Sequence, residues 1–534
     1  MRAVWIWTRL SRWNAVSTIP RASDYAILPK HSFHTSSLFL KTKEKDRTVF
    51  QTTDFIPPRT ALFVSGSSSQ FATFVVDPHF DFDERFADLD NYQQEITLRQ
   101  LSFDLHKCSA LWTRLQELWK RRAELETRRK QSVENFSKPS DVDEESKLKG
   151  RLLRGEIKQL NKDIAEIEID TITTLLKLPV RLHKYVPMGN NPFVSFDTTA
   201  DQEVQFMECS KLNSNSVNAA NRVARREKVR VEAHDVNKAL QQSRLVEYTD
   251  EAPRGYFLRG QAAELELKLL NYGRSFLEEK GYSGISGPHL YRSVVVEGTG
   301  FISDDHDDVS ATTGSLINVK PNQPFLIDTV DTRGSLFRSL FLTNSTVNLY
   351  AAHFTNCEAA ENILPIRLHS SSRVYRAVSN KGLEEEEDEK YCRIFRPSQT
   401  HTVSFCTAFT DAETTEEYLT ETLELFKSFY LSLGLRFRLV SLPASKLGIS
   451  EALRYELKVW SPLLSEFVPC GHIAFHDDFV SKRLRCHVDK PEQNKFLRFF
   501  TGSLLDLTPF VACCIDGSEG GIFEHIRRNP ACVL

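Results

Sequence analysis

Residues 254–300 constrain the fold of this 534-residue chain more than any other stretch. They open with a short strand-like run at 256–258 and continue with apolar residues three or four positions apart, as on one face of a helix. These apolar positions are Leu265, Leu269, Tyr272 and Phe276. Gly281 is typical of a residue that ends a helix, and Gly287 with Pro288 then disfavours further helix. The pattern predicts a strand, an amphipathic helix and a second extended segment.

This stretch, which includes LELKLLNYGRSFLEEKGYSGISGPHLY, resembles motif 1 of class II aminoacyl-tRNA synthetases. It is similar to the seryl-tRNA synthetase version in particular. In that family the motif 1 helix and strand form the dimer interface, and the proline closes the strand. The resemblance implies an α+β fold: an N-terminal antiparallel coiled-coil hairpin plus a class II aminoacyl-tRNA synthetase-like antiparallel sheet flanked by helices. Without the resemblance, the pattern is only a helix that leads into a strand.

Two segments between residues 88 and 180 have apolar residues that alternate by three and four positions, which is typical of a coiled-coil seam. The first seam is Leu98, Leu101, Leu105, Cys108, Trp112 and Leu115. The second seam is Leu153, Ile157, Leu160, Ile164, Ile167 and Thr171. Pro139 lies between them in a turn-like sequence. We expect two long antiparallel helices that form a hairpin arm.

Basic residues are concentrated toward the tip of this arm. The candidates for RNA contact are Lys120, Arg121, Arg122, Arg128, Arg129, Lys130, Lys149, Arg151, Arg154 and Lys158. Acidic residues are interspersed, so a solvated hairpin of mixed charge without an RNA role is an equal reading. Seryl-tRNA synthetases lay such a hairpin against tRNA, and phosphate contacts need mobile cations on a long surface. The resemblance therefore implies that these basic residues contact tRNA or another RNA.

The composition is that of a soluble globular protein, with 41% hydrophobic and 26% charged residues. Its net charge of -3 gives no overall attraction to nucleic acid, so an RNA site must be a local patch. The ten cysteines have no metal-ligand spacing and indicate free, buried thiols in a reducing compartment. We expect neither a cofactor nor a metal.

The N-terminus has the composition of a mitochondrial transit peptide. The first 23 residues contain four arginines and no acid, and a Ser/Thr-rich run follows at 31–37. The alternative is a disordered tail. The apolar run is too short and too interrupted by arginine to span a membrane. We expect a transit peptide at 1–40, an N-terminal domain with the arm at 41–190, a linker at 191–249 and a degenerate catalytic domain at 250–534.

The resemblance allows the nucleotide-binding residues of the family to be compared with this chain. Motif 2 of the family contains an arginine and, two residues later, a glutamate that serves nucleotide binding. Arg376 is present, but Val378 replaces the glutamate and can neither carry charge nor accept a hydrogen bond through its side chain. The motif 2 loop becomes an acidic run at 384–389. Such a run would repel ATP and the tRNA acceptor end.

The other family positions for serine and ATP differ as well. A glutamate that helps to hold serine aligns with Ser345, to within one or two residues, and no acid lies within that margin. A second family carboxylate is retained as Glu466, without the Ser-Ser and Asn that should follow it. In motif 3 the ATP-gripping arginine aligns with Pro509, and no lysine or arginine lies between Arg498 and Arg527. Together with Val378, four positions of one active site have therefore lost chemistry that adenylate formation requires.

Two nearby pairs of residues have weaker interpretations. Lys482 and Arg483 could compensate for the lost cations, although they match a different family motif. His472 and His476 are interpreted as surface or supporting residues, because their spacing fits no common zinc site.

The chain is similar to a catalytically degenerate group of paralogues, the seryl-tRNA synthetase-like insect mitochondrial proteins. The resemblance implies a protein of the mitochondrial matrix that binds serine tRNA or other mitochondrial RNA without charging it. It also implies pairing, with itself or with mitochondrial seryl-tRNA synthetase, and no insertion into a membrane. One alternative is a divergent but active mitochondrial seryl-tRNA synthetase that uses ATP, serine and tRNA. Another is a partner-stabilising subunit whose RNA contact is incidental.

Overall fold

The structure is a computed structural model of the full chain. It describes residues 60–63, 76, 78–134, 144–198, 233–252, 254–301, 326–327, 340–375, 394–488, 495–515 and 522–529. All of these belong to the compact unit Phe55–Leu534. The predicted transit peptide, the acidic run at 384–389, Arg376, Val378 and most of the predicted linker lie outside the described residues.

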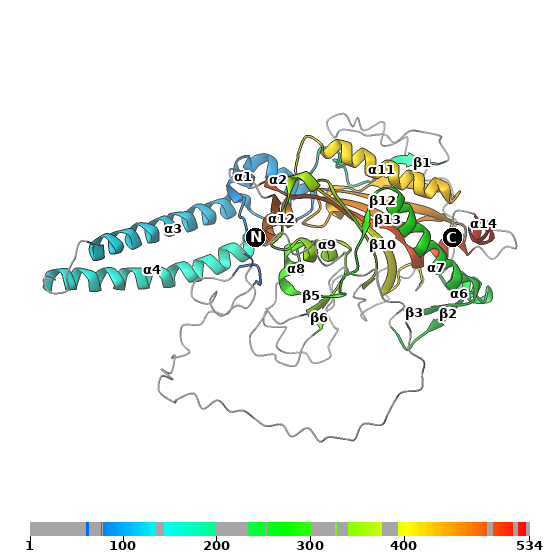
Figure 1. The fold of residues 1–534 in the computed structure, drawn as a ribbon, viewed down its shortest axis with the longest axis horizontal. Coiled ribbons are helices and arrows are strands. Elements are labelled where there is room, and N and C mark those ends of the chain that lie inside the picture. Colours follow the sequence, from blue (N-terminus) through cyan, green and yellow to red (C-terminus); the bar gives the residue numbers. More distant parts are fainter. Residues whose placement is uncertain are drawn as a thin grey trace, which may run out of the picture. The chain divides into compact units, whose positions relative to one another are not determined.

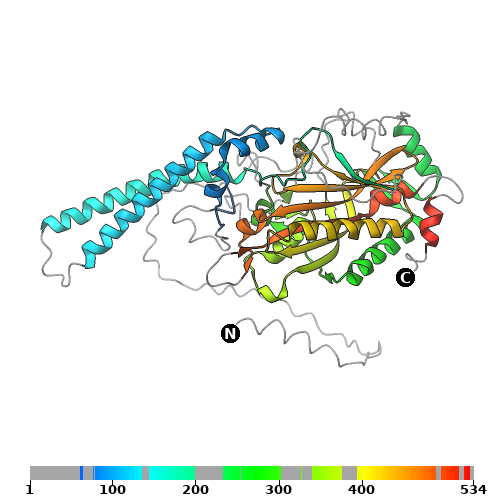
Figure 2. The same cartoon turned by 90° about the horizontal axis from the view of Figure 1, so that it is seen from above.

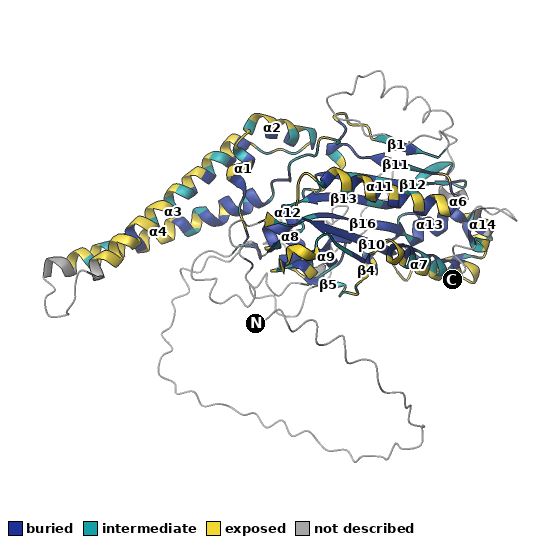
Figure 3. Cartoon of the chain, turned by 45° about the horizontal axis from the view of Figure 1, so that its top comes forward, coloured by how far each residue is buried: buried dark blue, intermediate teal, exposed yellow. Residues whose placement is uncertain are grey.

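The predicted helical hairpin is present. Helices α3 (Leu105–Glu134) and α4 (Glu144–Leu176) lie side by side (Figures 1 and 3). Their facing side chains form a small apolar cluster of Leu125, Ile157, Leu160 and Ile164. Ile157, Leu160 and Ile164 recur at spacings of three and four on α4, so a narrow apolar stripe of α4 faces α3. The second predicted seam is therefore confirmed.

The start of the first predicted seam was wrong, because Leu98 and Leu101 do not belong to α3. Leu98 ends a separate helix, α2 (Leu89–Leu98), which follows the short α1 (Phe82–Phe86). Gln100 then has a positive φ of 58°, which interrupts the helix. Asp104 caps the start of α3 by accepting a hydrogen bond from the backbone N–H of Lys107 at 3.0 Å. The capping signal at Asp104 outweighs the continuous apolar spacing.

An eight-stranded sheet forms the centre of the protein. Its order is β1-β11-β12-β13-β16-β10-β9-β4, and neighbouring strands are antiparallel except β4 and β9. The strands are β1 (Phe193–Asp197), β11 (Phe437–Ser441), β12 (Leu453–Ser461), β13 (Glu466–Asp477), β16 (Arg498–Asp506), β10 (Gln399–Phe409), β9 (Ile366–Tyr375) and β4 (Ser283–Gly284). The sheet and its flanking helices confirm the predicted α+β fold.

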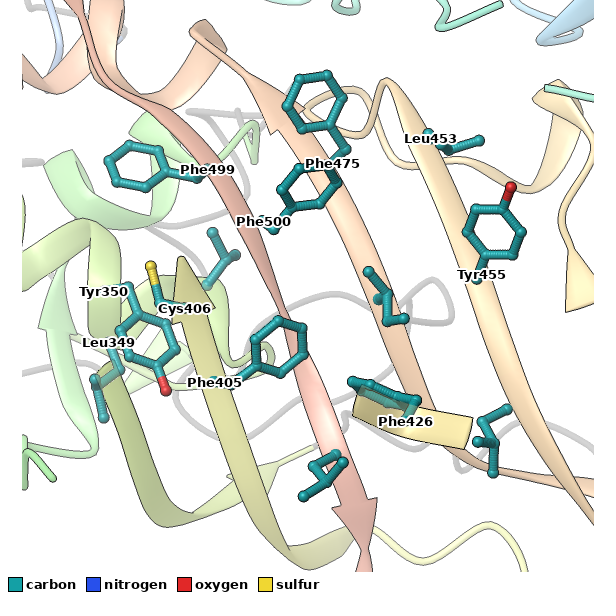
Figure 4. Packing of buried hydrophobic residues seen from close by; sticks show 14 of the residues in the cluster. Leu349, Tyr350, Phe405, Cys406, Phe426, Leu453, Tyr455, Phe475, Phe499 and Phe500 are labelled. Atoms are coloured by element: carbon teal, nitrogen blue, oxygen red, sulfur yellow. The ribbon is translucent and has the colours of Figure 1, made fainter. Parts of the chain in front are cut away.

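Helices α7 (Gln261–Glu279), α11 (Thr415–Ser432) and α13 (Leu507–Cys514) cover one face of this sheet (Figures 2 and 3). Aromatic side chains fill the space between them. Phe405 of β10 packs at 5.4 Å between ring centroids against Phe426 of α11, and Phe429 of α11 packs at 5.1 Å against Phe276 of α7. Figure 4 shows Phe405, Phe426, Phe475 and Phe500 within this core. Because side chains alternate along a strand, the neighbours of these residues point to the opposite face.

Shorter elements surround the sheet. Strands β2 (Val246–Thr249) and β3 (Gly255–Leu258) pair with each other after α6 (Ala233–Gln242). The remaining strands are β5 (Leu290–Arg292), β6 (Leu326–Ile327), β7 (Leu340–Leu342), β8 (Glu358–Ala359), β14 (His487–Val488) and β15 (Lys495–Phe496). The remaining helices are α8 (Ser293–Gly298), α9 (Val347–Phe354), α12 (Phe479–Leu484), α14 (Ile522–Arg528) and the 3-10 turns η7 (Glu361–Ile363) and η8 (Ala444–Lys446).

The strand and helix predicted at 254–300 are confirmed as β3 and α7. Gly281 has a φ of 84°, which glycine adopts without a side-chain penalty. The backbone N–H of Tyr282 returns to the carbonyl of Leu277 at 3.0 Å and closes the helix end. The chain then enters β4 and the extended segment before β5.

Candidate nucleic-acid interface and synthetase-like site

The predicted RNA-contacting side chains all lie on the outer surface of the arm. Arg122 is half-buried, and Lys120, Arg121, Arg128, Arg129, Lys130, Lys149, Arg151, Arg154 and Lys158 are exposed. On α4, Arg151, Arg154 and Lys158 are three and four positions apart and so share one side of the helix. The described cations of each helix extend over about 15 Å at ~1.5 Å rise per residue. The arm therefore presents mobile cations on an elongated surface, which suits a polyanion.

The face of the sheet opposite α7, α11 and α13 carries a row of polar side chains. Strand register aligns them across five neighbouring strands. In order they are Glu456 of β12, His472 of β13, Ser503 of β16, Ser404 of β10 and Ser370 of β9. We call this set the polar row. The row includes the motif 2 strand β9 at one end and the motif 3 strand β16 at its centre, where the resemblance implied the ATP and serine sites.

Hydrogen bonds connect the polar row to its neighbours. The Oγ of Ser503 lies 3.2 Å from Nδ1 of His472, and the Oγ of Ser404 lies 2.9 Å from the hydroxyl of Tyr350 on α9. The Oγ of Ser404 also donates to the carbonyl of Ser370 at 3.2 Å. Ser404 and Ser503 are fully buried. The hydroxyl groups of Ser404 and Ser503 are thus engaged within the protein, whereas the Oγ of Ser370 has no hydrogen-bond partner among the described residues.

Cations beside the polar row are already engaged by carboxylates. Arg454 of β12 pairs with Glu451 at 2.7 Å. Lys458 pairs with Glu456 at 3.2 Å. In the described part of the chain, these β12 cations therefore bring no uncompensated positive charge to the row. A triphosphate needs such charge as pyrophosphate leaves.

The turn that contains Ser345 lies between the ends of motif 1 and motif 2. The backbone N–H of Thr343 donates to the carbonyl of His289 at 2.9 Å, and the N–H of Tyr375 donates to the carbonyl of Thr343 at 2.8 Å. The side chain of Thr343 is buried, and its hydroxyl donates to the carbonyl of Ser345 at 2.9 Å. The structure thus brings three segments of the predicted site together. At Ser345 and at Thr343, two positions away, it offers hydroxyl groups in place of a carboxylate.

Pro509 lies in the first turn of α13, where a proline is tolerated because the first backbone N–H groups of a helix have no intrahelical partner. Its side chain is buried. The adjacent Thr508 is within 2.8 Å of the hydroxyl of Tyr256 and accepts from Thr400 at 3.2 Å. The position aligned with the ATP-gripping arginine is therefore part of the packed interior.

Glu466 is not in the polar row. It is the first residue of β13, opposite Ser461, and it lies six residues before His472. At ~3.3 Å per residue this corresponds to about 20 Å along the strand. A role of Glu466 in an ATP or serine site remains a prediction drawn from the family resemblance.

The suggestion that Lys482 and Arg483 replace the lost ATP-binding cations is not supported by their positions. Both side chains are buried on α12. Lys482 pairs with Asp81 and Asp478, and Arg483 donates to the carbonyls of Leu176 and Glu297. Their charges hold the root of the arm against the core.

The structure also shows where His476 lies. His476 is buried, not at the surface, with Nδ1 at 3.0 Å from the carbonyl of Ser450 and Nε2 at 2.9 Å from Thr501.

Among the described residues, no group of three or more His, Cys, Asp or Glu side chains is arranged to hold a metal ion. The cysteines there are free, and all but Cys357 are buried. No helix in these described ranges is long and apolar enough to cross a membrane.

Sequence reasoning missed the polar row and the buried ion pairs at the root of the arm. The row depends on strand register between residues up to 133 positions apart, from Ser370 to Ser503. One signal in the sequence was the alternation of polar and apolar residues along β12, where Glu456 and Lys458 fall between apolar residues. This alternation places the polar residues on one face of the sheet.

The fold is that of the class II aminoacyl-tRNA synthetases. The family model described as "tRNA synthetase class II core domain (G, H, P, S and T)" matches residues 340–517, from β7 through α13. The fold is similar to that of seryl-tRNA synthetase from Pyrococcus horikoshii, solved with ATP, at a TM-score of 0.61 and 17% identity. That likeness covers 83% of this chain and 95% of the archaeal one.

More specifically, the chain is similar to seryl-tRNA synthetases and to a seryl-tRNA synthetase-like protein. It is 23% identical over 486 residues to the serine–tRNA synthetase-like protein Slimp of Drosophila melanogaster, which covers 89% of this chain and 90% of that protein. It is 26% identical over 338 residues to the mitochondrial serine–tRNA ligase of Bos taurus, covering 63% of this chain and 57% of the ligase.

Proposed function

We propose that this protein is a non-catalytic, mitochondrial seryl-tRNA synthetase-like protein that binds tRNA or other mitochondrial RNA along its arm. It forms a dimer through motif 1, with itself or with mitochondrial seryl-tRNA synthetase. It has no serine–tRNA ligase activity and needs no cofactor.

The exposed cations of α3 and α4 carry the RNA-binding part of this proposal. The protein as a whole is slightly acidic, with a net charge of -3, so a polyanion must be attracted locally. Arg151, Arg154 and Lys158 supply such a local surface, with side chains free to adjust to phosphates. Acidic neighbours such as Glu156 lower the net positive charge of this surface. The lower charge favours contact with RNA of a matching shape over indiscriminate binding.

The substitutions at three family positions support the absence of ligase activity. Pro509 is buried in the position of an arginine, and Ser345 lies in the position of a carboxylate. Val378, which lies outside the described residues, replaces a glutamate in the sequence. Each loss removes an interaction with ATP or serine, and restoring activity would require replacements for all of them.

Exposed apolar side chains on the motif 1 elements support dimerisation. Leu267 of α7 is 60% exposed and Phe257 of β3 is 57% exposed. A helix buries its apolar positions where it can, and the opposite face of α7 already packs on the sheet through Leu265 and Leu269. An apolar residue on the outer side fits a second subunit.

The N-terminal composition supports mitochondrial import. Residues 1–40 match a transit peptide, and the mitochondrial serine–tRNA ligase of Bos taurus is among the similar proteins. The matrix is where mitochondrial tRNA would be met. The domain limits at 40, 190 and 249 belong to this same proposal.

The RNA-binding part is tested by titrating purified full-length protein with a mitochondrial serine tRNA transcript in a filter-binding assay. We expect saturable binding that weakens steeply with salt. Binding that is absent at low salt would reject the RNA role and favour a subunit that only stabilises a partner.

A further inference from the structure

The end of α4 is held by side chains that come from other elements. The last carbonyl groups of a helix have no intrahelical partner and carry partial negative charge. Arg483 donates to the carbonyl of Leu176, the last residue of α4. The segment that follows the helix is bound as well: Arg85 donates to the carbonyl of Pro179 at 3.2 Å, Tyr92 to that of Pro179 at 2.7 Å and Arg99 to that of Val180 at 3.0 Å. We call Arg85, Tyr92, Arg99 and Arg483 the arm socket.

The socket ties α4 to several parts of the core at once. Arg85, Tyr92 and Arg99 come from α1, α2 and the residue after α2, and Arg483 comes from α12. Arg99 also donates to the carbonyls of Gly448 at 2.9 Å and Glu451 at 2.8 Å, just before β12. The end of α4 is therefore fixed from more than one direction.

The guanidinium groups of the socket are buried. Arg85, Arg99 and Arg483 are 7%, 4% and 5% exposed. A buried guanidinium is tolerated where its N–H groups find acceptors, so each arginine disfavours any arm position that would break its bonds. Asp81 pairs with Arg85 at 2.9 Å, and the ring of Phe479 lies 3.8 Å from the guanidinium carbon of Arg483.

Beyond the socket, the arm is held together by its own apolar seam. The cluster of Leu125, Ile157, Leu160 and Ile164 joins α3 only to α4. Nearer the root, Trp119 donates its indole N–H to Glu168 at 2.9 Å and stiffens the hairpin. A stiff arm with a fixed root can point in only one direction.

We infer that the arm socket sets a single direction of the arm, and that the protein selects RNA molecules able to reach the arm and the core in this preset geometry. This inference rests on the proposed RNA binding. Arg85, Arg99 and Arg483 are positioning residues in this scheme, because they act on RNA through the arm.

The direction of the arm is tested by a distance distribution between two probes. Spin-labelled unnatural amino acids replace Glu126 on α3 and Glu424 on α11, which are both exposed. This labelling does not use cysteine, so the native cysteines remain unlabelled. We expect one narrow distribution in the otherwise unmodified protein. We expect Arg99→Gln to broaden it at least twofold and Arg99→Lys to have an intermediate effect, since lysine keeps the charge without the fork of donors. Arg121→Gln on the arm surface is the matched control and should leave the width unchanged.

A second readout uses two RNA molecules. One is a full-length tRNA, and the other is a short stem that can contact only the arm. Arg99→Lys and Arg99→Gln should weaken tRNA binding by about tenfold and leave stem binding unchanged, whereas Arg121→Gln should weaken both. A loss of folding alone would lower binding of both RNAs together.

Three outcomes overturn the inference. They are a broad distribution in the unmodified protein, an unchanged width in a folded Arg99→Gln variant, and an equal loss of both RNAs in a folded variant. If Arg99→Gln does not fold, the unmodified protein and Arg99→Lys still decide the matter. Absence of RNA binding by the unmodified protein would reject the proposed function, while the distance measurement would still report on the socket.

Discussion

The ammonium nitrogen of Lys482 lies 3.1 Å from a carboxylate oxygen of Asp81, 401 positions earlier in the chain. The same nitrogen lies 3.0 Å from Asp478 and 3.2 Å from Glu84. Burial alone would lower the pKa of Lys482, but Asp81 and Asp478 raise that pKa above its ordinary value. Lys482 is therefore a fixed charge between the N-terminal segment and the core, and it is occupied by protein carboxylates.

Replacing Lys482 with methionine should strongly destabilise the protein. The substitution leaves Asp81 buried with one cationic partner fewer, and breaking a buried pair costs about 3–5 kcal/mol. The free energy of unfolding, measured by urea denaturation, reports this loss. The exposed Lys446→Met is the control and should change it by less than about 0.5 kcal/mol. Equal effects of the two substitutions would contradict the structural role of Lys482.

Stability should depend on the ionisation of Glu297. This buried carboxylate accepts from the hydroxyl of Thr60 at 2.5 Å and from the N–H of Ala61 at 2.8 Å. Burial nevertheless raises the pKa of Glu297 from its ordinary 4.5 to about 7. Between these two values the folded protein binds more protons than the unfolded chain, so the contribution of Glu297 to stability decreases as pH rises from 4.5 to 7. It should be nearly constant above pH 7.

The variant Glu297→Gln isolates this effect. The difference in unfolding free energy between the variant and the unmodified protein should change by roughly 3 kcal/mol across this pH range, in favour of the variant at high pH. Urea denaturation at pH 5, 6, 7 and 8 measures it. Parallel pH profiles for the two proteins would show that Glu297 does not titrate as described.

Charge reversal on the arm should weaken RNA binding and its salt dependence together. In Arg151→Glu with Arg154→Glu, two phosphate contacts are lost, so the slope of log affinity against log salt should fall by about 1.8. Filter binding at salt concentrations from about 50 to about 200 mM measures the slope of log affinity against log salt. Lys446→Glu, an exposed cation of the core, should leave the slope unchanged. An unaltered slope in the arm variant would remove these two arginines from the RNA interface.

A charge on the outer side of α7 should separate the subunits. Burial of a leucine contributes about 1.5–3 kcal/mol, and a symmetric interface loses this twice in Leu267→Glu. Sedimentation velocity should then detect monomers of the variant, whereas we expect dimers of the unmodified protein. Leu431→Glu on α11 is the matched control, because Leu431 is also half exposed. Dissociation by the control alone would place the interface on α11.

The long helices and the end of α7 could be predicted from the sequence, whereas the helix cap at Asp104 and the long-range polar contacts were missed. The apolar spacing around Leu160 is a local pattern that survives in the fold, and Gly281 marks the end of α7 for a local reason. Asp104 shows that a short capping signal can divide a continuous seam. Each of these features depends on neighbours within one or two helical turns.

The arm socket and the polar row have no comparable trace in the sequence. Arg99 and Arg483 bond to backbone carbonyls, which every residue possesses, so the identity of the acceptor leaves no pattern. Ser503 meets His472 only because β13 and β16 pair in one particular register. The family resemblance pointed to these strands, and the geometry shows which side chains they present.

The central claim is that the synthetase architecture persists without formation of seryl-adenylate. Serine-dependent ATP–pyrophosphate exchange, on the preparation that binds tRNA, tests this claim most directly. The account predicts exchange no greater than in a serine-free blank, because Pro509 and the hydroxyl groups at Thr343 and Ser345 supply neither the cation nor the carboxylate that the reaction needs. Serine-dependent exchange above the blank would contradict it and identify a divergent, working ligase.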